Sequence, residues 1–176
     1  DPVTGEITPY ENRLWLLRRD EPIRPVYDTP VKVTHEWWDR DGQHVWFVGN
    51  PKRFLGTGDE KATWRLRLSD LHLERVCDHF WHAHDSPCGR YVVGDRHFGG
   101  KFKRGTASSV HLVERDTGRE VTLVSHIPEH VTPGRQYHID PHPRFSPCGR
   151  YVKHTTPVRG RVEVDVHRVD AAIGRE

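Results

Sequence analysis

Short stretches in which apolar and polar residues alternate run along most of the chain, and helical periodicity is nearly absent. Alternation with a period of two is typical of half-buried β-strands, because successive side chains point to opposite faces. The 13 Pro and 15 Gly lie mostly between these stretches, where turns are expected. The pattern therefore predicts an all-β chain of short strands. The predicted strands are 13–17, 45–48, 63–68, 91–93, 109–114, 121–124, 151–154 and 162–169.

One sequence unit occurs three times and indicates which all-β fold to expect. In each copy a histidine precedes, by four residues, the start of a turn that ends in Gly42, Gly89 or Gly149. The first turn reads Asp-Arg-Asp-Gly, and the other two read Ser-Pro-Cys-Gly. Ser or Asp first, Pro second and Gly fourth favour a type I turn that ends in the left-handed region. Each turn joins one strand to the next and two more strands follow, which predicts the four-stranded blade of a β-propeller.

The repeats divide the chain into a single propeller arc. Residues 1–31 would supply the end of one blade, 32–77 and 78–126 two full blades, and 127–176 three strands of an incomplete blade. About 3.5 blades is fewer than the roughly four to eight that close a propeller. Because the sequence also contains no Met, we expect it to be part of a longer, ring-shaped protein. The alternative fold is a small β-sandwich.

Composition removes several function classes. The formal charge is only +2, from 27 basic and 25 acidic residues, and no basic stripe indicates nucleic-acid binding. No apolar run approaches the length of about 18 residues that a membrane span needs. The three Cys form no CxxC pair, which argues against a disulfide framework or a zinc ribbon. A reducing, cytoplasmic location fits this cysteine usage best.

Histidine is the unusual feature of the composition, with 14 copies in 176 residues. His35, His82 and His142 occupy the same position in the three repeats, on the first strand of each blade. First strands line the central channel of a propeller, so these three side chains should converge at one channel mouth. Convergent imidazoles suit a divalent transition metal or a general base. The alternative is that each histidine only forms a hydrogen bond within its own blade.

Other polar residues could join such a site. Asp140, His138 and Gln136 precede His142 at steps of two, so along a strand they would share its face and form a series of candidate ligands. Six further histidines fall on predicted outer strands or loops, and we expect them to be solvated or to serve in packing. They are His44, His72, His97, His111, His154 and His167.

Segments 34–42, 82–95 and 142–149 together resemble the oligogalacturonate lyase family. That family forms a seven-bladed propeller related to the TolB-type propellers, and the similarity extends over nearly the whole chain. The Ser-Pro-x-Gly turns are common to TolB-like propellers, so the histidine in front of each turn is the specific part of the resemblance.

The resemblance implies a function. The family cleaves short oligogalacturonates by β-elimination with a manganese ion, so Mn²⁺ or another divalent metal would be the cofactor. Carried over to this sequence, His82 and His142 match metal ligands, His35 matches the proton-abstracting histidine, and Arg13 matches the active-site arginine. The partner would be an oligogalacturonate or a related uronide, with neither nucleic acid nor membrane involved.

One departure from the family pattern affects this expectation. The family has a Gln followed by His-x-His before the last turn, whereas this sequence has Asp140 two residues before His142. Asp can bind a hard cation, so a metal site could survive, and either Gln136 or His138 could replace the family's Gln. The alternative is that Asp140 changes or abolishes the activity. The alternative function is a non-catalytic propeller of TolB or WD40 type that serves as a binding or scaffold module.

Overall fold

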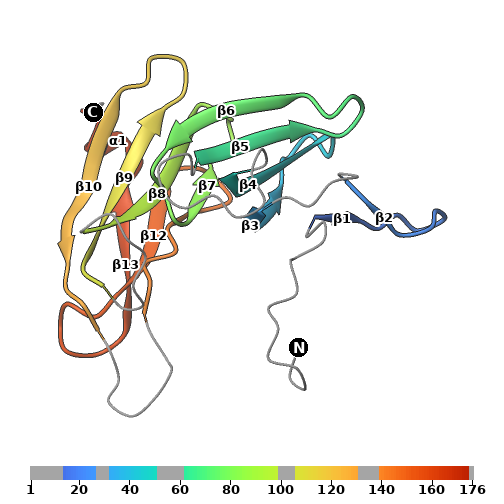
Figure 1. Cartoon of the computed structure of the whole chain (residues 1–176). Coiled ribbons are helices and arrows are strands. Elements are labelled where there is room, and N and C mark those ends of the chain that lie inside the picture. Colours follow the sequence, from blue (N-terminus) through green and yellow to red (C-terminus); the bar gives the residue numbers. More distant parts are fainter. Residues whose placement is uncertain (1–13, 27–31, 51–61, 99–105, 131–138, 175–176) are drawn as a thin grey trace, which may run out of the picture.

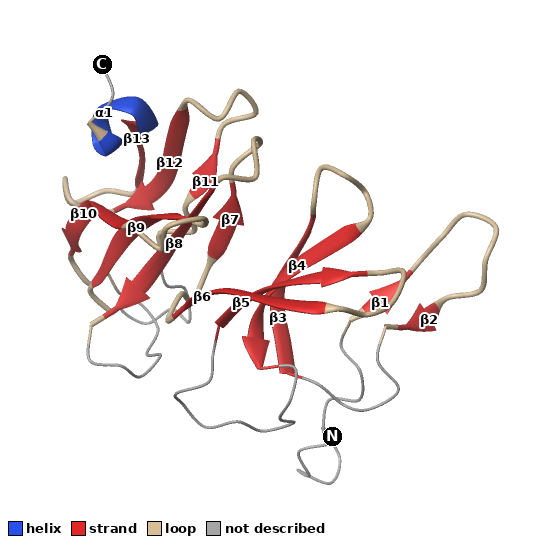
Figure 2. Ribbon diagram, turned by 90° about the horizontal axis from the view of Figure 1, so that it is seen from above, coloured by secondary structure: helices blue, strands red, loops and turns tan. Residues whose placement is uncertain are grey.

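The computed structural model describes residues 14–26, 32–50, 62–98, 106–130 and 139–174, and these residues form an almost all-β structure (Figure 1). Within these ranges the strands make four antiparallel sheets in chain order. The prediction of an all-β chain that forms part of a β-propeller is confirmed. Figure 2 shows the successive sheets fanning out beside one another as propeller blades do. The described residues contain no helix long and apolar enough to cross a membrane.

Each sheet is a meander in which neighbouring strands are consecutive along the chain. The first two sheets consist of β1 (Trp15–Leu16) and β2 (Arg24–Pro25), and of β3 (Lys32–Trp38), β4 (His44–Asn50), β5 (Ala62–Arg67) and β6 (Leu73–Asp78). The third sheet consists of β7 (Ala83–Asp85), β8 (Tyr91–His97), β9 (Ser108–Glu114) and β10 (Glu120–Ile127). The last sheet consists of β11 (Arg144–Phe145), β12 (Tyr151–Thr156) and β13 (Glu163–Arg168), and helix α1 (Val169–Ile173) follows it.

The last predicted strand differs from the expectation, and alternation alone did not mark β2, β3, β7 or β11. The predicted strand 162–169 ends at Arg168, and α1 begins at the next residue. Its sequence, Val-Asp-Ala-Ala-Ile, contains two strong helix formers, and the helix ends at Gly174, whose φ of 72° is the left-handed conformation common after a helix. The alternation pattern also did not pick out β6, whose residues are mostly half-buried and pair with β5.

The repeated turns have the predicted conformation. The backbone N–H of Gly89 donates to the Ser86 carbonyl at 2.8 Å, and Gly149 bonds to Ser146 in the same way at 2.9 Å. Gly89 has a φ of 70°, which is favourable for glycine and costly for residues with a Cβ. The Ser86 hydroxyl accepts the N–H of Tyr91 at 2.9 Å and so links the turn to β8. Each turn thereby fixes the register between the first and second strands of its sheet.

The core lies between the sheets. Along β4, Phe47 packs in an apolar cluster with Leu16 of β1 and Val26, which follows β2. Its neighbour Trp46 packs on the opposite side with Val92 of β8. Along β8, Val92 faces the β3–β6 sheet and Val93 faces the β11–β13 sheet. The two-residue period therefore gives each central strand two buried faces, which holds the sheets together in series.

A close approach joins the segment before β7 to the third sheet. The Phe80 side chain is fully buried and lies over Gly94 of β8. A Cβ atom at residue 94 would lie 2.2 Å from Cγ of Phe80, so only glycine fits there without a shift of the ring. This contact sets where the chain enters β7 and therefore where His82, two residues after Phe80, is held.

Candidate metal and catalytic site

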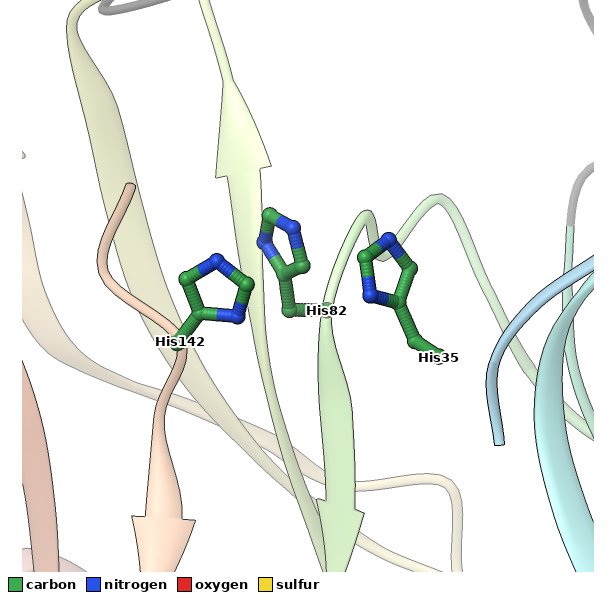
Figure 3. A group of neighbouring side chains, drawn as sticks. All are labelled: His35, His82 and His142. Carbon is green, nitrogen blue, oxygen red and sulfur yellow. The ribbon is translucent and has the colours of Figure 1, made fainter. Parts of the chain in front are cut away.

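Three histidines meet where the first strands of three sheets lie close together (Figure 3). Of the three, only His35 lies within a first strand, as predicted, whereas His82 and His142 lie just before β7 and β11. We refer to His35, His82 and His142 as the central cluster. One ring nitrogen from each lies within 4.8 Å of the others. The ring centroids are 4.4 Å apart for His35 and His82 and 3.7 Å apart for His82 and His142. The predicted convergence of these three side chains is thus present in the structure.

Unusual backbone conformations aim two of these side chains. His35 lies in a bulge of β3 between Thr34 and Trp37 and has a φ of 57°. His142, just before β11, has a φ of 44°. Left-handed backbone is uncommon for residues other than glycine and concentrates at functional sites, where neighbouring structure must enforce it. A β-bulge also redirects the side chain that it carries, and here it places the His35 ring beside that of His82.

Asp95 of β8 positions His82. Its carboxylate accepts the backbone N–H of His82 at 2.8 Å and lies 2.7 Å from Nδ1 of the same residue. Because an ionised carboxylate can only accept, Nδ1 carries the proton and Nε2 keeps its lone pair. A histidine that binds metal commonly donates its other N–H to a carboxylate in this way.

The same carboxylate reaches the next sheet. Its Oδ2 accepts the backbone N–H of His142 at 3.3 Å, so Asp95 links two members of the central cluster. Complete burial acts to raise the pKa of Asp95, but the hydrogen bond and charge of His82 outweigh it and the pKa is lowered. The pKa of His142 is also lowered, first by desolvation and then by the nearby His82. Both shifts favour the forms that a metal site needs, an ionised carboxylate and a neutral imidazole.

The central cluster opens to solvent. His82 is buried, with 6% of its surface exposed, whereas His35 and His142 are exposed. The three rings line a cleft with a volume of about 70 Å³, which Glu36 and Arg144 also line. The cleft therefore presents imidazole nitrogens beside one carboxylate and one guanidinium group.

The structure places the remaining predicted site residues as follows. Asp140 is 6% exposed and lies two residues before His142, but it is not in the group of ring nitrogens described above. Its charge still acts on His142. Arg13, Gln136 and His138 lie outside the described residues. The roles given to all of these residues stay predictions.

The donor set fits a divalent transition metal. His82 offers Nε2 with its tautomer fixed by Asp95, and His142 offers a ring nitrogen close enough to converge on the same ion. The His35 ring nitrogen is near enough to serve either as a third ligand or as a base beside the ion. Imidazole ligands alone favour zinc, iron, nickel or copper, whereas manganese also favours carboxylates. The Asp140 carboxylate would add the oxygen ligand that manganese prefers beside imidazoles.

Sequence reasoning missed two residues of this site. Asp95 is a charged residue at the end of the apolar run Tyr-Val-Val-Gly in β8, and a carboxylate inside a buried strand is the signal that could have revealed it. Arg144 lies two residues after His142 in the sequence and lines the same cleft. Asp140 was considered because it lies two residues before His142, and the same spacing after His142 could have identified Arg144.

Comparisons with known proteins agree with the architecture. No protein-family model matches the sequence, and no curated protein matches it significantly. An oligogalacturonate lyase from Vibrio parahaemolyticus is similar in structure, with a TM-score of 0.66 and 22% identity over 89% of this chain and 42% of the lyase. TolB from Acinetobacter baumannii has a TM-score of 0.63 and 14% identity over 86% of this chain and 33% of TolB.

A third structure, a nidogen/laminin complex, has a TM-score of 0.54 and 12% identity, over 85% of this chain and 49% of the matched one. The chain thus spans between a third and a half of the length of these proteins. At these identities the similarity shows the fold alone, which agrees with part of a β-propeller.

Proposed function

We propose that this chain carries the metal site and the proton-abstracting base of a lyase that cleaves oligogalacturonates by β-elimination. The observation that carries the proposal is the central cluster, in which three histidines from three sheets offer ring nitrogens within 4.8 Å of one another. The likeness to an oligogalacturonate lyase supports the same class of reaction. The proposal includes a cytoplasmic location.

His82 and His142 would hold the metal. Both face the cleft, and the Asp95 carboxylate fixes one through its side chain and both through their backbone N–H groups. Asp140, Gln136 and His138 stay candidates for further ligands. A bound Mn²⁺ or similar ion would withdraw charge from the carboxylate of a uronide and so acidify the neighbouring C–H.

His35 would act as the base. In a β-elimination the base takes the proton next to the carboxylate, a carbon–carbon double bond forms, and the bond to the glycosidic oxygen breaks. His35 is exposed and its ring is 4.4 Å from that of His82, so it can face a substrate held at the other two histidines. A general base contributes about 10²–10⁴-fold to such a rate.

A cation is needed to bind an anionic sugar. Arg144 lines the cleft and is exposed, so its guanidinium can pair with a uronate carboxylate. Arg13 was assigned this task by the resemblance, and the two arginines can be separated by substituting each with alanine and measuring KM.

The proposal is tested by adding a short oligogalacturonate and Mn²⁺ to the chain and recording the ultraviolet absorbance of the unsaturated product. We expect product that disappears with a chelator, and we expect His35→Ala to lower turnover by about 10²–10⁴-fold while Mn²⁺ still binds. His72→Ala, at an exposed histidine outside the cleft, is the matched control. Turnover of His35→Ala at the rate of the unaltered chain would refute the role of this residue.

The likeness to TolB favours one other function, a propeller that binds a sugar or protein without reacting. In the same experiment it predicts retention of the oligogalacturonate, measured by calorimetry, with no unsaturated product at any metal concentration. The two functions therefore differ in one measurement, which is whether unsaturated product forms from the bound oligogalacturonate.

A further inference from the structure

A second group of metal-ligating side chains lies on the β12–β13 hairpin, away from the central cluster. We call His154, Asp165 and His167 the hairpin cluster. One ligand atom from each lies within 4.8 Å of the others. His154 and Asp165 are directly opposite across the two strands, and His167 is two residues further along β13, so all three share one face of the sheet.

The two imidazoles point ring nitrogens at each other. Nε2 of His154 lies 3.0 Å from Nε2 of His167, and the rings are stacked with an interplanar angle of 11°. Two imidazole ligands of a tetrahedral zinc ion, with Zn–N near 2.0–2.1 Å, have their nitrogens about 3.3 Å apart. The separation of the two nitrogens is therefore within a few tenths of an ångström of the one in a zinc site, and binding needs a rotation of the rings that turns both lone pairs toward the ion.

The backbone fixes the tautomer of His154. Its Nδ1 lies 3.2 Å from the carbonyl oxygen of Thr155. A carbonyl can only accept, so Nδ1 carries the proton and Nε2 presents its lone pair to the cluster. A backbone carbonyl is one of the usual partners for the remote N–H of a metal-bound histidine.

The hairpin cluster is accessible from one side. The His154 side chain is buried, whereas the side chains of His167 and Asp165 are 28% and 58% exposed. The Asp165 carboxylate oxygen lies 3.9 Å from Nε2 of His167. An ion could thus enter from solvent, bind two imidazoles and one carboxylate, and keep water at a fourth position.

A third group shows what a cluster without a metal role looks like. Asp39, Asp41 and His44 also lie within 4.8 Å of one another. There Arg65 supplies the positive charge, with Nε 2.7 Å from Asp39 and NH2 3.0 Å from Asp41. Among the described residues, the Asp165 carboxylate forms its ion pair with His167, and no arginine or lysine bridges to it.

We propose that His154, Asp165 and His167 form a second divalent-metal site of the zinc type, independent of the proposed lyase function. The ion replaces the proton shared between the two Nε2 atoms, and His167 then carries its proton on Nδ1, so binding releases no net proton. The site joins β12 to β13, the last strand of the described sheet, and its effect is to fasten that hairpin.

The test uses the chain without a purification tag and with His35→Ala and His82→Ala, which remove the central cluster. Zn²⁺ is titrated in competition with a chromophoric chelator, and far-ultraviolet circular dichroism confirms folding. We expect one zinc per chain. Adding His167→Ala should weaken the remaining binding by at least about 100-fold, whereas adding His72→Ala should leave it unchanged. Absence of zinc binding in the first variant, or unchanged binding after His167→Ala, would overturn the proposal.

A measurement on the unaltered chain covers the case in which a variant fails to fold. Long-range ¹H–¹⁵N spectra report the state of each imidazole nitrogen. Saturation with Zn²⁺ should shift Nε2 of both His154 and His167 and leave His72 in place. If the signals of His154 and His167 do not move at saturation, the pair is only a hydrogen-bonded contact and the proposal is wrong.

Discussion

The central cluster and the hairpin cluster use the same side chains but depend on different levels of the structure. The central cluster takes one histidine from each of three sheets, so its geometry depends on packing between sheets. The hairpin cluster takes all its members from two adjacent strands, so its geometry depends only on their register. Changes that displace one sheet against another should therefore weaken the first cluster and spare the second.

The contact between Phe80 and Gly94 offers the strongest test of whether the two clusters respond differently to a displacement between sheets. In Gly94→Ala the new Cβ would lie 2.2 Å from Cγ of Phe80. Because the ring is fully buried, we expect the free energy of unfolding to fall by about 3 kcal/mol. The displacement passes to His82, so metal binding at the central cluster should weaken while zinc at the hairpin cluster is retained. Chemical denaturation and the two metal titrations measure these effects.

Gly118→Ala is the matched control for this substitution. Gly118 has a φ of 69°, but nothing lies within 4 Å of its added Cβ. It should show only the smaller loss of stability from placing alanine in left-handed backbone. Equal losses for the two variants would mean that the Phe80 contact is unimportant.

Asp95→Asn tests the next largest effect. Asparagine has one acceptor oxygen and an NH₂ group, so it cannot accept from both N–H groups of His82 and from that of His142. Loss of a partner that orients a metal ligand costs about 10–100-fold in affinity, and we expect this loss for Mn²⁺ at the central cluster alone. Asp70→Asn, at an exposed ion pair with Arg67, should change neither cluster. Weakening of both clusters by Asp95→Asn would contradict their independence.

His111 tests whether a buried histidine outside both clusters affects stability without affecting metal binding. It belongs to neither cluster, and burial and then the charge of Arg96 lower its pKa. The unfolded chain therefore binds this proton more readily. Its contribution to stability is present above about pH 6.5, the ordinary histidine pKa, and is lost as the pH falls through the lower folded pKa.

His111→Gln should accordingly reduce the loss of stability on acidification below about pH 6.5, by less than about 1.4 kcal/mol per pH unit. Urea unfolding at several pH values measures this change, and His72→Gln is the exposed control. An unchanged pH profile in His111→Gln would show that this histidine does not titrate differently on folding. Neither substitution should alter the metal titrations.

The sequence predicts much of the central cluster and nothing of the hairpin cluster. His35, His82 and His142 share a position in a repeat, so their convergence follows from the symmetry of blades around a channel. Asp95 could not be placed with them, because its role depends on how β8 lies against His82 and His142. The left-handed backbone of His35 and His142 could not be located from the sequence either, because only a small fraction of histidines adopt a positive φ.

The hairpin cluster was missed for a different reason. His154 and His167 were each treated as an isolated residue on an outer strand, expected to be solvated or to serve in packing. Their pairing depends on the register of β12 and β13, in which His154 faces Asp165. Alternation does not determine this register, because a shift of one strand by two residues would leave the same side chains on the same face. The loop between the strands sets the register instead. Helix α1 was also missed, because the alternation in the predicted strand 162–169 continues up to its first residue.

The most direct test of the central claim is the effect of substoichiometric Mn²⁺ on the imidazole NMR signals of the unaltered chain. A paramagnetic ion broadens the nuclei nearest to it. We predict that the signals of His35, His82 and His142 broaden first, and that the signal of His72 stays sharp. If these three signals stay sharp, or if all histidines broaden equally, the convergent histidines are not a metal site and the proposed lyase function fails with them.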